Sequence, residues 1–173
     1  MRWRDMKIKN KTIIIALFLI ISLMLFLPSY ISFRSQEINN EYLESFKNEL
    51  VTTVQQKPSF DMNNLTPFEW DRMYVIRPYT SRTEMQKIVG IEWTTADTYI
   101  GYLIFDKTWL GEYPLDDDIF HKLVFVKGNK VVLDVTLDRS NVDFTQINSP
   151  VITGNALFDI DKTDGRNIIK TSK

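Results

Sequence analysis

Few side chains in this sequence have the types and the spacing that catalysis or metal binding requires. The chain has one histidine and no cysteine. His121 follows closely after an acidic run formed by Asp116, Asp117 and Asp118. A histidine can act as a general base, and together with carboxylates it can bind a metal ion. A single histidine beside a turn is more often structural, so we expect neither a metal ion nor a cofactor.

Other catalytic patterns are missing from the sequence. Without cysteine, a Cys–His nucleophile pair and disulfide bonds are both excluded. No serine begins an S-x-x-K motif, and no G-x-S-x-G motif occurs. Residues 159–165 are superficially similar to a calcium-binding loop, but Lys170 stands where the bidentate glutamate would belong. We interpret this stretch as the end of a strand followed by a turn.

Aromatic side chains are the better candidates for a binding surface. Tryptophan and tyrosine are favoured in protein–protein hot spots and at membrane interfaces. Residues 108–118 (TWLGEYPLDDD) read as a loop, where an aromatic ring has less reason to occur than in a core. Packing inside the domain is the alternative for the aromatic residues as a group. The predicted binding surface comprises Trp109, Tyr113, Asp116, Asp117, Asp118 and His121.

A charge-free apolar segment near the beginning of the chain indicates where these residues would work. Residues 12–33 contain no charged side chain, and residues 13–27 read IIIALFLIISLMLFL. At the rise of an α-helix, residues 12–33 would be about 33 Å long, against a hydrocarbon core of about 30 Å. The segment therefore predicts a transmembrane helix.

A cleaved signal peptide is the rival interpretation of this segment. Cleavage requires small residues in an A-x-A-like arrangement, and residues 27–34 (LPSYISFR) contain no pair of small residues two apart. We therefore expect an uncleaved signal-anchor. Five cations and one anion precede the segment, and Arg34 follows it. By the positive-inside rule, the N-terminus is cytoplasmic and the chain from Arg34 onward is extracytoplasmic.

The outer part of the chain has the size and charge of one soluble domain. Removing the five cations and one anion of the leader from 21 Lys+Arg and 22 Asp+Glu leaves a net charge of −5. Binding of nucleic acid depends on clustered Lys and Arg, so this surface argues against it. We divide the chain into a basic cytoplasmic leader at 1–11, a transmembrane signal-anchor at 12–33, a membrane-proximal amphipathic helix at 34–57 and an extracytoplasmic α+β domain at 58–173.

Residues 36–56 have the pattern of that amphipathic helix. Four apolar residues recur at helical spacing, namely Leu43, Phe46, Leu50 and Val54. Ser35 could cap the beginning of the helix, and Pro58 forbids its continuation. We expect Pro28 to kink or end the membrane helix before this one begins. The apolar stripe packs either on its own domain or on a partner helix or membrane surface.

The remaining sequence reads as strands with one short helix. Residues 60–67 read as a loop, and residues 68–77, 99–105 and 156–160 as strands. A capping box beginning at Ser81 opens a helix that Gly90 ends.

The strongest local signal is a hairpin, in which Gly128-Asn129 joins strands at 122–127 and 130–137. Val131, Leu133, Val135 and Leu137 would share its buried face. Hairpin links imply antiparallel pairing. The expected fold is therefore α+β, with two layers in which helices pack on one face of a four- to five-stranded, mainly antiparallel sheet.

Residues 70–81 (WDRMYVIRPYTS), followed by residues 123–129 (LVFVKGN), resemble a pattern in small uncharacterised exported or membrane-anchored proteins of Gram-positive-type bacteria. The resemblance covers roughly residues 65–137 and centres on the motif W-D-x-M-Y-V-x-x-P-Y. Those proteins typically carry a lipoprotein cysteine, which this chain replaces with a membrane helix. The resemblance implies a location in the cell envelope and a fold type, but it implies no catalytic residue.

Together these patterns predict a single-pass membrane protein with a small extracytoplasmic binding domain and no enzymatic activity. Another envelope or secreted protein is the expected partner, including a toxin or effector that the domain would neutralise. Two alternatives remain open. One is a small envelope enzyme that uses the cluster of Asp116–Asp118 and His121, and the other is an accessory subunit of a larger membrane complex.

Overall fold

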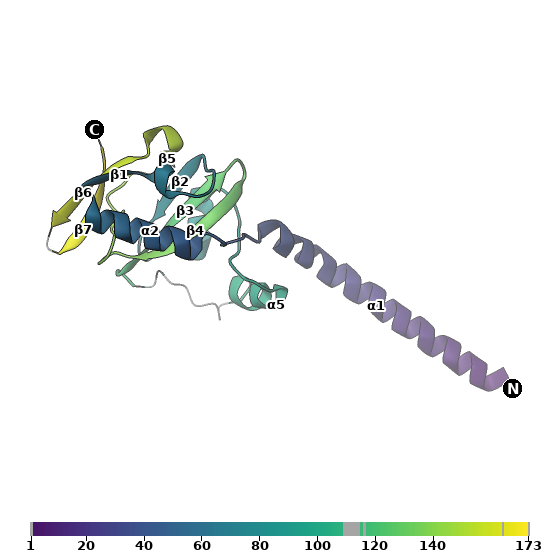
Figure 1. Ribbon diagram of the computed structural model, residues 1–173. Coiled ribbons are helices and arrows are strands. Elements are labelled where there is room, and N and C mark those ends of the chain that lie inside the picture. Colours follow the sequence, from purple (N-terminus) through teal and green to yellow (C-terminus); the bar gives the residue numbers. More distant parts are fainter. Residues whose placement is uncertain (1, 109–114, 116, 164, 173) are drawn as a thin grey trace.

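The charge-free segment lies within one uninterrupted helix, α1 (Arg2–Gln36), which projects from the rest of the chain (Figure 1). The computed structural model describes residues 2–108, 115, 117–163 and 165–172. Pro28 lies inside α1, so the helix does not end there. Ser35 also lies inside α1, where its hydroxyl donates to the carbonyl oxygen of Ser32 (2.8 Å), and it caps no second helix. A segment that enters a bilayer must satisfy its backbone internally, which favours continuing the helix past proline.

The part of α1 from Ile13 to Gln36 is long and apolar enough to cross a membrane, with a mean hydropathy of 2.6 in its most apolar window. No part of that window is buried against the other described residues. Length and composition support the span, and a signal sequence shares both properties.

The amphipathic helix is shorter than expected. α2 spans Leu43–Gln56 and buries Phe46, Leu50 and Val54, so its apolar stripe packs on its own domain. The chain between α1 and α2 turns instead of continuing as helix, because the side chain of Asn39 accepts a hydrogen bond from the backbone N–H of Glu41 (3.0 Å). Such local bonds from asparagine compete with helix formation.

The strands form two antiparallel sheets, where one sheet was expected. The larger sheet has the order β4-β3-β2-β5, and the smaller has the order β1-β6-β7. The strands of the larger sheet are β2 (Arg72–Ile76), β3 (Phe120–Lys127), β4 (Lys130–Asp138) and β5 (Val151–Ile152). Those of the smaller sheet are β1 (Ser59–Asp61), β6 (Leu157–Thr163) and β7 (Arg166–Thr171). The α+β class is confirmed.

Residues 60–67, expected as a loop, contain most of β1 and a short helix, α3 (Met62–Leu65). The side chain of Asp61 begins this helix by accepting a hydrogen bond from the backbone N–H of Asn63 (2.9 Å). The predicted strand at 156–160 corresponds to β6. Of residues 159–165, those up to Thr163 form the end of β6, and β7 begins at Arg166. Asp164 lies outside the described residues.

Helices cover both faces of the larger sheet, where one face was expected. On β2, Met73 and Val75 join the core beneath α2, whereas Tyr74 and Ile76 join a second core beneath α4 (Arg82–Val89). A strand that is apolar at successive positions must be covered on both sides. As predicted, Ser81 forms a capping box with Glu84, and Gly90 ends α4 in the left-handed region (φ 76°).

The hairpin of β3 and β4 is confirmed, but its register shifts between Phe125 and Val126. Because of this bulge, Val131 packs in the core beneath α4, while Leu133, Val135 and Leu137 pack in the core beneath α2. The expectation that all four share one face is therefore wrong for Val131. A bulge inserts a residue and reverses the side-chain alternation beyond it.

The strand expected at residues 99–105 is helical. α5 (Tyr99–Gly101) continues directly into a π-helical turn, η1 (Tyr102–Asp106). The hydroxyl of Thr98 accepts a hydrogen bond from the backbone N–H of Gly101 (3.1 Å) and begins the helix. This segment packs against the end of α1, a contact that a local sequence pattern does not reveal.

Candidate functional site

The structure places the predicted binding residues in different surroundings. Trp109, Tyr113 and Asp116 lie outside the described residues. Asp117 and Asp118 are exposed in the turn before β3. There the side chain of Asp117 accepts a hydrogen bond from the backbone N–H of Ile119 (3.0 Å), which stabilises the turn.

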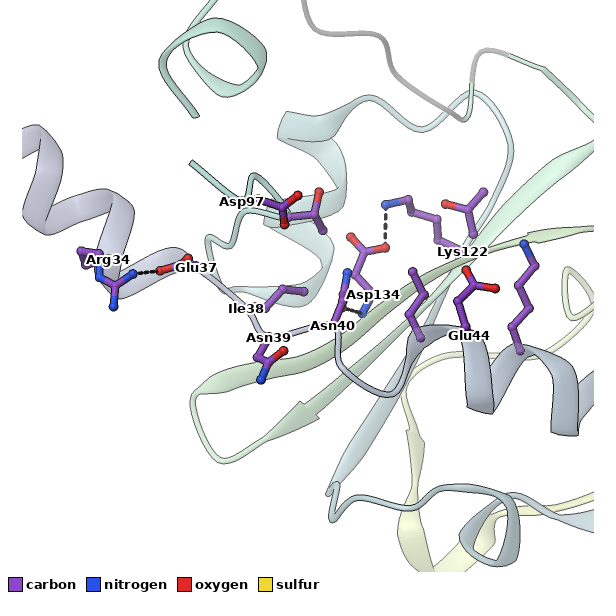
Figure 2. A pocket seen from close by; sticks show the side chains of 13 residues that line it. Arg34, Glu37, Ile38, Asn39, Asn40, Glu44, Asp97, Lys122 and Asp134 are labelled. Carbon is purple, nitrogen blue, oxygen red and sulfur yellow. Dashed lines mark hydrogen bonds and ion pairs between the residues drawn. The ribbon is translucent and has the colours of Figure 1, made fainter. Parts of the chain in front are cut away.

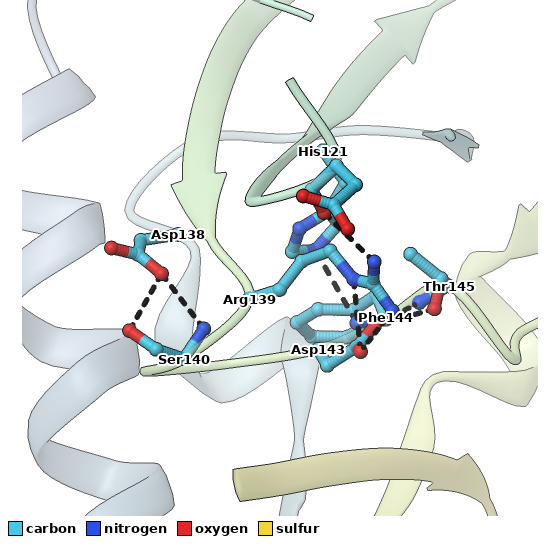
Figure 3. Close-up of polar contacts among 8 residues, drawn as sticks. His121, Asp138, Arg139, Ser140, Asp143, Phe144 and Thr145 are labelled. Carbon is cyan, nitrogen blue, oxygen red and sulfur yellow. Dashed lines mark hydrogen bonds and ion pairs between the residues drawn. The ribbon is translucent and has the colours of Figure 1, made fainter. Parts of the chain in front are cut away.

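His121 is separated from the acidic run because it is fully buried on β3. Its Nε2 atom accepts a hydrogen bond from the backbone N–H of Phe144 (3.3 Å), whose ring lies nearby (Figure 3). Burial lowers the pKa of His121 from 6.5 to about 4, against the opposing charge of Asp143. A neutral acceptor inside a core matches the structural role of histidine and argues against a general base at this position.

The polar groups around His121 stabilise the chain after β4 (Figure 3). Arg139 forms an ion pair with Asp143 (3.0 Å), whose carboxylate also accepts from the backbone and hydroxyl of Thr145. Burial raises the pKa of Asp143, but the hydrogen bonds from Thr145 and Arg139 outweigh it and leave the pKa below its ordinary value. Arg139, Asp143 and Thr145 satisfy one another, whereas the Nδ1 atom of His121 is buried without a hydrogen-bond partner among the described residues. We assign the group to folding because these bonds tie the chain after β4 together.

A different site emerges on the side of the domain next to α1. An open cleft of about 920 Å³ is lined by the end of α1, the beginning of α2 and the strands β3 and β4 (Figure 2). Its walls carry both signs of charge, with Arg34 and Lys47 against Glu44 and Asp97. Such walls suit a polar ligand better than an apolar one.

The floor of the cleft is a buried ion pair. Lys122 on β3 and Asp134 on β4 lie 2.6 Å apart (Nζ–Oδ1), and the two residues are 7% and 5% exposed. The second carboxylate oxygen of Asp134 accepts a hydrogen bond from the indole N–H of Trp93 (2.8 Å). Trp93 is itself buried in the core beneath α4. A lysine on the neighbouring strand of the hairpin and a tryptophan distant in the sequence thus hold this carboxylate in place.

A second cavity of about 410 Å³ shares this floor, because Lys122 and Asp134 line both. Its far wall contains an ion pair between Arg82 and Asp106 (2.6 Å). Arg82 also donates to the carbonyl oxygen of Trp93 (3.1 Å), which connects the two ion pairs. Among the described residues, the Oδ2 atom of Asp106 is buried without a hydrogen-bond partner.

The arrangement can bind acceptor oxygens. An ammonium group has three donors, and among the described residues Lys122 uses one of them, toward Asp134. The others can serve a carboxylate, a carbonyl group or water that enters either cavity. Within the described part of the chain, no group of three His, Cys, Asp or Glu side chains could hold a metal ion.

The sequence contains one signal for this site that was not used to predict it. Asp134 interrupts a run of apolar and β-branched residues in β4, at a position that the pattern assigns to a sheet face rather than a turn. A charge there must be exposed or paired. Its pairing with Lys122 follows from the register of β3 and β4, but the approach of Trp93 follows from tertiary packing alone.

Comparisons with known proteins assign no function to this site. No protein-family model, no curated protein and no solved structure matches the chain.

Proposed function

We propose that the protein is a single-pass, membrane-anchored binding protein whose extracytoplasmic domain holds a segment of another envelope or secreted protein in the polar cleft. The buried pair of Lys122 and Asp134 at the floor of an open cleft is the observation that carries this proposal. A buried ion pair is costly to maintain and contributes little net stability. Its place beneath an opening is therefore better explained by binding than by folding.

The position of α1 supports an anchored role. The cleft includes Arg34 and Glu37 from the last turn of α1 and the residue after it. A ligand in the cleft would thus lie close to the end of the candidate membrane span. The basic leader before the span favours a cytoplasmic N-terminus, which leaves the domain outside.

The shape and charge of the cleft support a protein segment as the ligand. Peptides present backbone carbonyl oxygens, which the ammonium group of Lys122 can bind, and charged side chains, which walls of both signs can pair. Neutralisation of a toxin or effector is one form that this binding could take, since a partner held in the cleft would be kept at the membrane surface.

Affinity purification from detergent-solubilised membranes tests the proposal with full-length protein. Reversing the charge of two exposed wall residues, in Glu44→Lys with Asp97→Lys, changes the cleft without touching its buried floor. Glu49→Lys is the matched control, because Glu49 is exposed on the same helix but does not line the cleft.

We expect the unmodified protein and Glu49→Lys to recover one partner in stoichiometric amount, and the double variant to lose it. Recovery of no stoichiometric partner by the unmodified protein contradicts the proposal. Equal recovery by all three proteins contradicts the assignment of binding to the cleft.

A subunit of a larger membrane complex is the second candidate, because the most apolar part of α1 is not buried against the other described residues. Replacing residues 13–29 with an unrelated apolar helix separates the two roles, because it keeps the contacts of Tyr30 and Phe33 with the domain. A binding protein that needs α1 as a tether keeps its partner after the exchange, whereas a subunit that binds through α1 loses it.

A further inference from the structure

A second structural feature lies beside the point where α1 leaves the candidate membrane span. The segment that comprises α5 and η1 (Tyr99–Asp106) stands away from both sheets and lies next to the C-terminal end of α1 (Figure 1). We call it the α5–η1 segment. It contributes Gly101, Phe105 and Asp106 to the smaller cavity, and three of its side chains are exposed.

Aromatic contacts attach this segment to α1. The rings of Tyr30 and Tyr99 meet edge to face with centroids 5.4 Å apart, and those of Phe33 and Tyr102 are also 5.4 Å apart. Phe33 and Tyr102 are 3% and 0% exposed, respectively. The depth of the segment relative to α1 is therefore set by buried packing.

The opposite side of the segment is apolar and exposed. Ile100 is 69% exposed, Ile104 40% and Phe105 55%. Residues four apart on a helix lie on one face, so Ile100 and Ile104 form a continuous apolar surface. On α1, Tyr30 and Ile31 are exposed as well, and Tyr30 contacts the segment directly. The apolar surface of the candidate span thus extends onto the segment.

The depth of the segment matches a membrane interface. About 20 helical residues cross the hydrocarbon core, so a span that begins at Thr12 reaches its far boundary near Ile31. Tyrosine is enriched at this boundary because its ring is apolar and its hydroxyl is polar. Tyr30, which is 46% exposed and packs on Tyr99, lies at this level, and the ammonium of Lys107 lies 4.9 Å from the ring of the buried Tyr102. A lysine there can extend toward the headgroups.

We propose that the α5–η1 segment lies in the outer interface of the bilayer that α1 crosses, with Ile100, Ile104 and Phe105 inserted among the lipid chains. This inference rests on the proposed membrane anchoring and adds a second lipid contact to it. Two contacts fix the tilt of the domain, whereas one helix followed by a flexible connection would not. The segment also borders the smaller cavity, so lipid contact holds the binding site at the membrane surface.

Site-specific fluorescence on full-length protein in vesicles of phosphatidylcholine and phosphatidylglycerol tests this inference. Because the chain has no cysteine, single substitutions allow labelling with an environment-sensitive dye at one position at a time. The test positions are Ile100→Cys and Phe105→Cys. The controls are Ile88→Cys and Leu157→Cys, whose native side chains are 49% and 57% exposed on other parts of the domain. Ile20→Cys reports on the span itself.

We expect nitroxide-labelled lipids to quench the dye at positions 100 and 105 several-fold more strongly than at positions 88 and 157, while iodide in the water does the reverse. If the dye at positions 100 and 105 is quenched no more by lipid than at the two controls, while the dye at position 20 is quenched by lipid, the α5–η1 segment does not enter the bilayer. The proposed membrane anchoring through α1 would still be supported. If position 20 is open to iodide as well, the proposed membrane anchoring itself fails.

Discussion

Lys122 and Asp134 illustrate how a single pair of residues can set the character of a site. Lys122 belongs to the central strand β3 and Asp134 to the neighbouring edge strand β4, and most side chains around them are apolar. The fold tolerates them because each satisfies the other and Trp93 supplies a further hydrogen bond to Asp134. Removing one partner would leave a buried charge without compensation. The free-energy cost of that unpaired charge is much larger than the net stabilisation that the intact pair provides.

Lys122→Met is therefore expected to lower the free energy of unfolding by about 3–5 kcal/mol. Adding Asp134→Asn should restore part of this loss, because the neutral amide oxygen can still accept the hydrogen bond from Trp93. Urea unfolding of the full-length protein in detergent, followed by circular dichroism, measures both variants and Asp134→Asn alone. Strictly additive losses in this double-mutant cycle would show that the two charges do not interact.

The lowered pKa of His121 predicts how the free energy of unfolding depends on pH. Its pKa is about 4 in the folded protein and 6.5 without burial, so the unfolded chain binds the proton more readily. The stabilisation from the neutral histidine is complete above pH 6.5 and is lost as the pH falls toward 4. We expect the free energy of unfolding to decrease by about 3 kcal/mol across this range. Urea unfolding between pH 4 and 7.5 measures it.

His121→Gln is the control for this prediction, because glutamine keeps an acceptor for the backbone N–H of Phe144 but does not titrate. The pKa values of Asp138 and Asp143 are also lowered, so their contribution is lost at more acidic pH than that of the histidine. An equal decrease in both proteins between pH 6.5 and 4 would show that another group causes the dependence.

At the scale of elements, α4 shows how local sequence defines a helix at both ends. Ser81 and Glu84 exchange hydrogen bonds at its beginning, and Gly90 turns the chain at its end. Its inner residues, Met85 and Val89, then pack on the second face of the larger sheet. The helix thereby covers Trp93, which holds the floor of the cleft.

Gly90 offers a clean test of backbone conformation. It adopts φ +76°, and a Cβ atom there would meet nothing within 4 Å. Gly90→Ala should therefore lower the free energy of unfolding by about 1–2 kcal/mol through backbone strain without a steric clash. Gly154→Ala is the matched control, since its Cβ atom would also meet nothing within 4 Å but its φ is not in the left-handed region.

For Gly154→Ala we expect a change within about 0.5 kcal/mol. Thermal or urea unfolding of the two variants under the same conditions measures both changes in the free energy of unfolding. A similar loss in both would indicate that the cost at Gly90 does not arise from its positive φ.

At the scale of the whole molecule, the helix and the domain form one unit. The chain after α1 pairs through Glu37 with Thr94, and Gln36 donates to Glu92 (2.9 Å). Together with the contact between Phe33 and Tyr102, these interactions hold the cleft against the end of the candidate span. A ligand would consequently meet the site at a defined distance from the end of the candidate span.

The proposed orientation of the molecule is testable because the chain lacks cysteine. In cells that express Leu157→Cys, a membrane-impermeant maleimide should label the intact cells, since Leu157 is 57% exposed on the domain. With Lys9→Cys in the leader, labelling should require permeabilised cells. The reverse pattern would place the domain in the cytoplasm, and recovery of the labelled domain in the medium would indicate cleavage after the apolar segment.

Local patterns were sufficient for some elements and insufficient for others. The hairpin around Gly128 and the capped helix from Ser81 to Gly90 were predicted correctly, because a turn or a cap is defined by neighbouring residues. Residues 99–105 were predicted as a strand and are helical, since burial of Tyr102 against α1 decides their conformation. Likewise, the division of the strands between two sheets depends on which segments meet after folding.

The sequence by itself determined an apolar helix long enough to span a membrane, the α+β class and the absence of cysteine chemistry, because each of these depends on composition or on nearby residues. The tertiary structure alone decided that His121 belongs to the core and that Trp93, Lys122 and Asp134 meet beneath a cleft. The physical reason is burial. Whether a polar side chain is a ligand contact or a core residue depends on what the rest of the chain packs around it.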